Sequence, residues 1–264
     1  MKKDGHIHTP FCPHGSSDEL RSYVYKAVAQ GFEEISFTEH APLPPSFKDP
    51  TPLKDSAMKV SEMELYIEQI EKVKKEFQKE VKINVGLEVD YINEYEEETR
   101  HFLNTYGPYL DDSLLSVHFL NKEDSFYCLD YSAEEFEHII TKFGSVEEVY
   151  KAYFKAVASS VKADLGSYKP KRIGHITLVH KFQKKFPCAV SFQNEVLHIL
   201  NEVKNRNLEL DYNAAGFHKP LCQEAYPSKE VVALAQQKNI PLVYGSDAHC
   251  AKDVGQSYTK LFER

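Results

Sequence analysis

The sequence predicts a parallel α/β protein in which strands and helices alternate within one domain. Short β-type runs and helical patterns follow one another along all 264 residues, and this alternation favours parallel βα units over a sandwich. Seven or eight such units fit one closed barrel of this size. A doubly wound open sheet is the competing architecture. Its dinucleotide-binding version has no support, because no Gly-x-Gly-x-x-Gly motif follows a strand. No domain boundary is evident, so residues 1–264 are expected to form a single domain.

The strands are expected where short apolar or β-branched runs lie between turn-forming residues. These runs occupy residues 5–9, 34–38, 81–89, 113–119, 173–179, 208–213 and 241–245. Residues 41–57 contain five prolines and are predicted to form a long loop.

The helices follow from capping signals and from apolar residues at helical spacing. Ser16-x-x-Glu19 and Ser61-x-x-Glu64 predict capping boxes that open the first two helices, which end near residues 31 and 79. Five further helical stretches lie at residues 94–106, 132–143, 145–164, 191–205 and 228–239.

The composition excludes several classes of partner. The net charge is −8, from 32 Lys plus Arg against 40 Asp plus Glu, so neither nucleic acid nor an anionic membrane surface is an expected partner. No apolar run of 18 residues is present, and the N-terminus is polar at once, without a signal-peptide core. The five cysteines are widely spaced, which fits reduced thiols and a cytoplasmic location. The composition does not determine the oligomeric state.

Histidine is unusually frequent, with 12 residues, and seven of them fall at or just after predicted strand ends. Carboxylates join them at the same edge. The metal-capable residues there are His6, His8, His14, Glu39, His40, Glu88, His118, His175, Asp247 and His249. A barrel brings the carboxyl ends of its strands to one face, where active sites are built. The sequence therefore predicts a metal site on that face.

Spacing supports this prediction. Residues i and i+2 of a strand point to the same face, so His6 and His8 can bind one ion together. Asp247 and His249 have the same spacing and offer a carboxylate and an imidazole. Each motif alone occurs by chance, and a lone histidine is more often a hydrogen-bonded core residue, but their joint occurrence favours the metal interpretation. Cys12 near His14 could form a nucleophile–base pair, although a packing role beside metal ligands is the better interpretation.

Seven segments resemble the polymerase-and-histidinol-phosphatase (PHP) superfamily, and within it the histidinol-phosphatases. They span nearly the whole chain: DGHIHTPFCPHG, FTEHAPL, GLEVDY, LLSVHFL, KPKRIGHITLVHKF, LELDYNAAGFHKPL and YGSDAH. The His-x-His opening with a late Ser-Asp-x-His is specific for the superfamily. The resemblance implies a distorted (β/α)7 TIM-like barrel with three divalent metal ions, whether zinc, iron or manganese.

The resemblance also implies a ligand set. The first ion would take His6, His8, Glu88 and Asp247; the second would share Glu88 and take His118 and His175; the third would take His14, His40 and His249. Glu39 is not a ligand in that pattern and would hydrogen-bond one.

The activity implied is hydrolysis of L-histidinol phosphate, a step of histidine biosynthesis, by a metal-bridging hydroxide. Asp247 or His249 would relay a proton to the leaving group. Arg172 would hold phosphate oxygens, with His218 or Lys219 as a further phosphate contact. Asp18, Asp90, Tyr91, Phe119 and Phe217 are candidates for the substrate's amine and imidazole.

Three alternatives remain open at this point. The same metals could serve an exonuclease or another small-phosphomonoester phosphoesterase. An amidohydrolase also opens with His-x-His, although His14 and the Glu39-His40 pair argue against it. The third alternative is a metal-bound module without catalysis.

Overall fold

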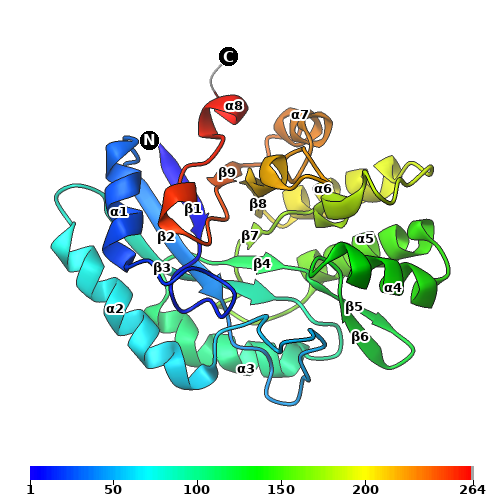
Figure 1. The fold of residues 1–264 in the computed structure, drawn as a ribbon, viewed down its shortest axis with the longest axis horizontal. Helices are drawn as coiled ribbons and strands as arrows, with labels where there is room; N and C mark the ends of the chain where they lie inside the picture. Colours follow the sequence, from blue (N-terminus) through cyan, green and yellow to red (C-terminus); the bar gives the residue numbers. More distant parts are fainter. Residues whose placement is uncertain (263–264) are drawn as a thin grey trace.

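The protein is a single α/β domain built on a parallel sheet that curves into a nearly closed barrel (Figure 1). The computed structural model describes residues 1–262. Seven strands lie side by side in the order β1 (Lys3–Ile7), β2 (Glu34–His40), β3 (Lys82–Asp90), β4 (Leu114–Ser116), β7 (Arg172–Ile173), β8 (Glu209–Asn213) and β9 (Leu242–Gly245). A parallel bridge between Ile7 and Ala248 brings the first and last strands together. The prediction of a seven-stranded barrel is confirmed.

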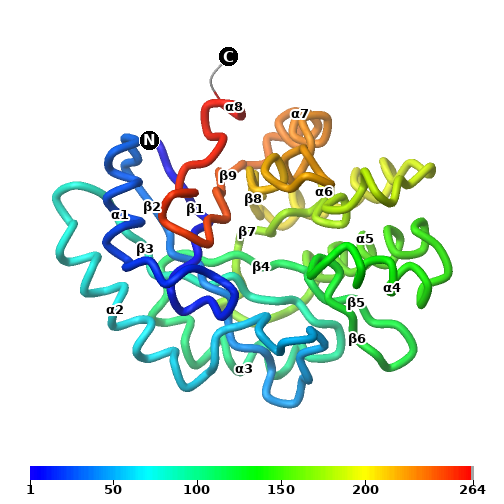
Figure 2. The backbone as a smooth tube through the Cα atoms, viewed as in Figure 1, coloured from blue at the N-terminus to red at the C-terminus, as the bar shows by residue number. Residues whose placement is uncertain are grey.

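Helices surround the sheet on its outside, as the backbone trace in Figure 2 shows. They are α1 (Leu20–Ala29), α2 (Met63–Glu76), α3 (Glu96–Tyr106), α4 (Ala133–Phe143), α5 (Val146–Lys162), α6 (Gln193–Asn205), α7 (Lys229–Gln237) and α8 (Tyr258–Phe262). Their apolar faces join the strands in one large buried core. The 41–57 segment is a loop without helix or strand, as its prolines predict. No helix within residues 1–262 combines the length and apolar character needed to cross a bilayer.

Two of the predicted strands are shorter than expected. The run at 113–119 is parallel only as β4, after which the chain forms the antiparallel hairpin β5 (Phe119–Lys122) and β6 (Ser125–Cys128). The run at 173–179 is a strand only at β7, and a 3₁₀ helix follows at η3 (Leu178–Phe182). A continuous apolar run shows burial, and it does not show where a buried strand ends.

The predicted capping boxes are wrong for the first two helices. Helix α1 begins at Leu20 without a side-chain cap. A short 3₁₀ turn, η1 (Val60–Glu62), precedes α2, and Glu62 accepts from the backbone N–H of Lys59 at 3.0 Å. Side-chain caps occur instead at Ser132 and Ser145, which open α4 and α5.

Candidate metal centre

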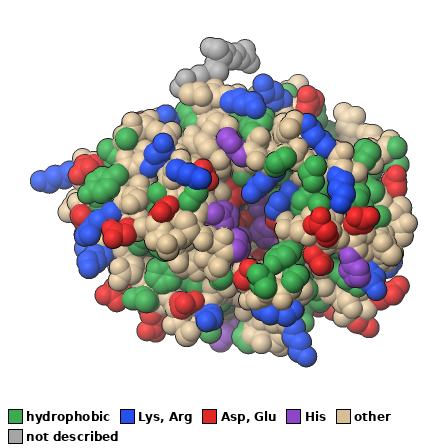
Figure 3. Space-filling model, viewed as in Figure 1, with side chains coloured by type: hydrophobic (Ala, Val, Ile, Leu, Met, Phe, Trp, Pro, Cys, Tyr) green, Lys and Arg blue, Asp and Glu red, His purple; other side chains and the backbone are tan. Residues whose placement is uncertain are grey.

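The nine side chains predicted as metal ligands converge at the carboxyl ends of the barrel strands. His6, His40 and Glu88 lie on β1, β2 and β3, and the others follow strands in short loops. Figure 3 shows histidines gathered in a hollow at the middle of this face. We call these nine residues the metal centre: His6, His8, His14, His40, Glu88, His118, His175, Asp247 and His249.

Glu88 occupies the middle of the metal centre, with imidazoles on both of its oxygens. Its Oε2 lies 3.3 Å from His6 Nε2, 3.5 Å from His8 Nε2 and 3.2 Å from His40 Nδ1. Its Oε1 lies 2.9 Å from His175 Nε2 and 3.7 Å from His118 Nε2. A carboxylate arranged in this way can contribute one oxygen to each of two cations.

Asp247 provides the second carboxylate. Its Oδ1 is 3.1 Å from His8 Nε2 and 3.7 Å from His6 Nε2. The residue has a positive φ of 53°, a conformation that is uncommon for a non-glycine residue and that concentrates at functional sites. Its other oxygen accepts from Asn213 Nδ2 at 3.1 Å, which fixes the orientation of the carboxylate.

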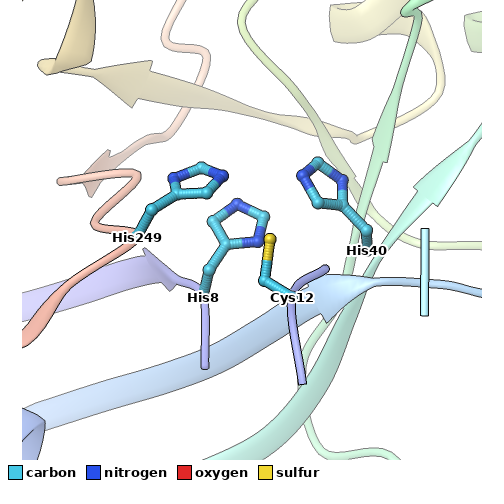
Figure 4. A group of neighbouring side chains, drawn as sticks. All are labelled: His8, Cys12, His40 and His249. Carbon is cyan, nitrogen blue, oxygen red and sulfur yellow. The ribbon is translucent and has the colours of Figure 1, made fainter. Parts of the chain in front are cut away.

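The potential ligand atoms fall into three groups, each compact enough to hold an ion. His6, His8 and Asp247 form the first group, and Glu88, His118 and His175 form the second. His8, Cys12, His40 and His249 form the third, with all ligand atoms within 4.8 Å of one another (Figure 4). The ring of His14 lies beside this third group, with its centroid 5.1 Å from that of His40 and 5.2 Å from that of His249.

Neighbouring groups hold the outward nitrogen of four of the imidazoles. Asp211 contacts His6 Nδ1 at 2.9 Å, Glu39 contacts His8 Nδ1 at 3.1 Å and Asp90 contacts His118 Nδ1 at 2.7 Å. The backbone carbonyl of Asp55 accepts from His14 Nδ1 at 2.8 Å. Such contacts fix the ring orientation and raise the basicity of the inward nitrogen. The expectation that Glu39 hydrogen-bonds a ligand is met at His8.

The electrostatics of the metal centre favour a bound cation. Burial disfavours a charge on His8, but Asp247 and Glu39 outweigh this effect and raise its pKa to about 9. Burial likewise opposes charge on His118, yet Asp90 and Glu88 raise its pKa to about 10. Burial would raise the pKa of Glu88, and the surrounding imidazoles bring it well below its ordinary value. The carboxylates therefore attract positive charge, whether as protons on imidazole or as metal ions.

The donor atoms fit divalent ions. His6 Nε2, His8 Nε2 and His40 Nδ1 are buried without a hydrogen-bond partner. Buried polar atoms are rarely left unpaired, because each costs about 1–3 kcal/mol. Mixed imidazole and carboxylate donors suit zinc, iron and manganese alike.

A cavity of about 700 Å³ opens from the metal centre to the surface. Most of the residues that line it are polar or charged. Besides ligands, they include Lys181, Asp130, Tyr131, His218, Lys219, Asp253 and Gln256. The structure places His218 and Lys219 at the cavity, and their contact with phosphate stays a prediction. His218 Nε2 also lies 2.9 Å from Ser257 Oγ.

Arg172 is an exception, and its predicted contact with phosphate is wrong. The side chain is fully buried and does not line the cavity. Its Nη2 donates to the carbonyl of Gly5 at 2.7 Å and to Asp112 Oδ2 at 3.2 Å. Arg172 precedes His175 by three residues, about 10 Å along an extended chain, and therefore lies toward the opposite end of the barrel. We call the polar group around it the basal cluster: Lys3, Glu34, Ser36, Asn84, Asp112 and Arg172.

Asp18 is also outside the cavity. Its Oδ2 accepts from the backbone N–H of Ala251 at 2.9 Å, so it anchors the loop after β9 instead of meeting substrate. Of the other candidates for the amine and imidazole, Phe119 and Asp90 line the cavity, and Asp90 is already engaged by His118. Tyr91 donates to Glu96, and Phe217 lies under Lys260, so neither contributes to the cavity.

Sequence reasoning missed Lys181 and Asp130. Lys181 Nζ lies 2.8 Å from Asp130 Oδ2 on the cavity wall. Burial opposes its charge, but Asp130 outweighs this and raises the pKa of Lys181, so the ammonium is charged. The available signal was the HKF sequence that begins five residues after His175, which places a cation in the short helical segment that follows a predicted ligand.

The barrel and the metal centre together are typical of a metal-dependent enzyme. The PHP domain family matches residues 4–215, and a PHP-associated family matches residues 228–264. The chain belongs to the PHP domain family.

Relatives of this chain cover its whole length. A histidinol-phosphatase of Bacillus subtilis is 54% identical over 266 residues, covering 100% of this chain and 99% of that protein. A probable histidinol-phosphatase of Deinococcus radiodurans is 32% identical over 96% of this chain and 88% of its own.

Two solved structures share the fold. A structural-genomics target from Listeria monocytogenes has a TM-score of 0.94 and 42% identity, covering 98% of this chain and 99% of its own. The histidinol phosphate phosphatase of Lactococcus lactis, crystallised with zinc, L-histidinol and phosphate, has a TM-score of 0.72 and 22% identity over 98% of this chain and 91% of its own.

Proposed function

We propose that this chain is a histidinol-phosphatase, which hydrolyses L-histidinol phosphate to L-histidinol and phosphate. The observation that carries the proposal is Glu88, whose two oxygens face two separate sets of imidazoles within 3.7 Å. A shared carboxylate of this kind suits adjacent divalent ions, the arrangement that clamps both oxygens of a displacement at phosphorus. The full-length Bacillus subtilis relative supports the choice of substrate.

We assign three divalent ions to the metal centre. His6, His8, Glu88 and Asp247 would hold the first ion, and Glu88, His118 and His175 the second. His14, His40 and His249 would hold the third. The zinc in the Lactococcus lactis complex supports zinc as one suitable metal. Bound ions would supply Lewis-acid polarisation of the phosphoryl group and activation of water near neutral pH.

The chain's own residues hold and orient the substrate. Lys181 and Lys219 line the cavity beside the metal centre and provide cations for phosphoryl oxygens. Asp253 and Asp55, also on the cavity wall, provide carboxylates for the substrate ammonium, and Tyr131 offers an aromatic face to the imidazole. The Nδ1 atom of His249 contacts the carbonyl of Asp247 at 3.0 Å. The same nitrogen lies 3.6 Å from the carboxylate Oδ1 of Asp247, and Asp247 or His249 would relay a proton to the leaving alkoxide.

Substrate choice decides between this proposal and its alternatives. Phosphoryl oxygens are common to all monoesters, so preference must come from contacts with the imidazole and ammonium. The test compares kcat/KM for L-histidinol phosphate and glycerol phosphate on metal-loaded protein, with the chelated protein as the control. We expect a preference of at least a hundredfold, and no turnover after chelation until metal is restored. A ratio within about tenfold would indicate a general phosphatase, and release of nucleotides from a single-stranded oligonucleotide would favour the exonuclease alternative.

A further inference from the structure

Cys12 lies against the metal centre in the turn that follows β1. Its backbone N–H donates to the carbonyl of Thr9 at 3.0 Å, and its own carbonyl accepts from Gly15 N–H at 3.1 Å. This tight turn directs the side chain inward, where it is only 5% exposed. A Cβ on Gly15 would approach Cys12 Cβ to 2.9 Å and Sγ to 3.4 Å, so the glycine leaves room for the Cys12 side chain.

The thiol faces three histidines of the metal centre. Cys12 Sγ and one ligand atom from each of His8, His40 and His249 all lie within 4.8 Å of one another. Figure 4 shows the sulfur beside His8 and between the flanking rings of His249 and His40. Four potential ligands from three segments of the chain match the count that zinc takes in closed sites.

The imidazoles of this group supply independent evidence for a ligand. His8 is fully buried and His40 is 7% exposed. Both keep a buried ring nitrogen without a hydrogen-bond partner, Nε2 in His8 and Nδ1 in His40. The other ring nitrogen of His8 is engaged by Glu39, so its unpaired atom is the one available to the cluster.

We propose that the Cys12 thiolate is a further donor to the ion that His40 and His249 hold in this group. On binding, the S–H bond breaks, sulfur keeps the electron pair and donates it to the ion, and the proton passes to solvent. A thiolate is a soft ligand, so this position would prefer zinc to manganese, whereas the first two positions offer only imidazole and carboxylate. The inference rests on the proposed metal centre and adds a ligand to it.

Cobalt reports a metal–sulfur bond directly, independently of catalysis. The protein is loaded with Co²⁺, the bound ions are counted by elemental analysis, and the near-ultraviolet absorption is scanned for a thiolate-to-cobalt charge-transfer band. We expect the band in the unaltered chain and its loss in Cys12→Ser and Cys12→Ala. We also expect the affinity of one of the three ions to fall at least about tenfold in both variants.

Cys250→Ser is the matched control. Cys250 follows His249 directly, but its Sγ donates to Asp253 Oδ2 at 2.9 Å and does not belong to the cluster, so its removal should leave the band intact. Should the Cys12 variants fold poorly, X-ray absorption of the unaltered zinc protein decides through a Zn–S distance of about 2.3 Å.

The outcomes separate this inference from the proposed function. Three bound ions without a band or a Zn–S distance would overturn the role of Cys12 and leave the phosphatase intact. A band that persists in Cys12→Ser, or that disappears in Cys250→Ser, would also overturn it. A chain that binds no metal would overturn both proposals.

Discussion

The two ends of the barrel both bury charged side chains, but they compensate the charge differently. At the basal cluster, Lys3 Nζ lies 3.0 Å from both Glu34 and Asp112, and Arg172 lies 3.2 Å from Asp112. Two carboxylates thus meet two cations of the chain itself. At the metal centre, the side chains that contact Glu88 and Asp247 are imidazoles and the neutral groups of Ser116 and Asn213. Several of the imidazoles keep unpaired nitrogens.

The difference shows which end is built for stability and which for binding. A buried carboxylate that is paired with a cation of the chain needs no bound ion. Loss of that cation leaves the carboxylate buried and unpaired, which destabilises the fold. Buried carboxylates among imidazoles are balanced either by protons on the imidazoles or by metal ions, so this end of the barrel can exchange protons for bound cations. Removal of charge should therefore damage folding at the basal cluster and damage catalysis at the metal centre.

The largest expected effect is at the metal centre. Asp247→Asn should lower kcat/KM at least about a thousandfold, because an amide is a poor ligand and cannot relay a proton. The free energy of unfolding in the presence of chelator should change much less than kcat/KM, since His8, the imidazole that Asp247 keeps protonated, can lose its proton when the carboxylate is removed. Steady-state kinetics and urea unfolding measure the two effects. Near-normal rates at saturating metal would contradict the assigned role.

The reverse pattern is expected at the basal cluster. Arg172→Met should lower the free energy of unfolding by about 3 kcal/mol, because it leaves Asp112 with one cation fewer in a buried site. The folded fraction should keep kcat/KM within about threefold of the unaltered chain.

Lys82→Met is the control for Arg172→Met, since Lys82 pairs with Glu34 at 3.3 Å but is 65% exposed. It should cost less than about 1 kcal/mol. A stable Arg172 variant that has lost activity would restore the phosphate role that the sequence suggested.

Lys181 extends the comparison of the two ends of the barrel, because it is a cation paired with Asp130 at the end that carries the metal centre. Lys181→Met should lower kcat/KM about 10- to 100-fold and weaken inhibition by inorganic phosphate, since a charge-assisted hydrogen bond contributes about 1.5–3 kcal/mol. Lys184→Met, three residues along on the exposed surface, should change neither constant. An unchanged inhibition constant for phosphate would restrict Lys181 to holding Asp130.

The smallest effect concerns acid stability. Burial would raise the pKa of Asp112, but Arg172 and Lys3 outweigh burial and hold it below 3.8. A carboxyl whose pKa is lower in the folded chain than in the unfolded chain stabilises the fold at pH values above its unfolded pKa. This contribution is lost as the pH falls through the folded pKa. The stability gap between the unaltered chain and Asp112→Asn, measured by urea unfolding with chelator from pH 6 to pH 3, should therefore narrow below about pH 4. A gap that stays constant would mean that the Asp112 charge adds nothing to folding.

Local patterns predicted most of the elements and the convergence of the metal-capable residues for a physical reason. Side chains alternate along a strand, and parallel strands end at one face, so the spacing of His6 with His8 and the positions of His40 and Glu88 were sufficient to bring them together. Strand boundaries were less certain. The β5–β6 hairpin and the two-residue β7 lie within apolar runs that fit a single longer strand equally well.

The sequence by itself determined the fold class, the alternation of its elements and the set of residues that gather at the catalytic face, because these depend on periodicity and on distances of a few residues. Only the tertiary structure decided which cations reach the cavity. Arg172 and Lys181 lie on either side of His175 in the same segment, yet one is buried beside Asp112 and the other faces the metal centre. The height of a residue along the barrel and the direction of its side chain depend on strand register and on where the strand ends. Both are set by contacts between segments far apart in the chain, as is the convergence of Cys12 with His40 and His249.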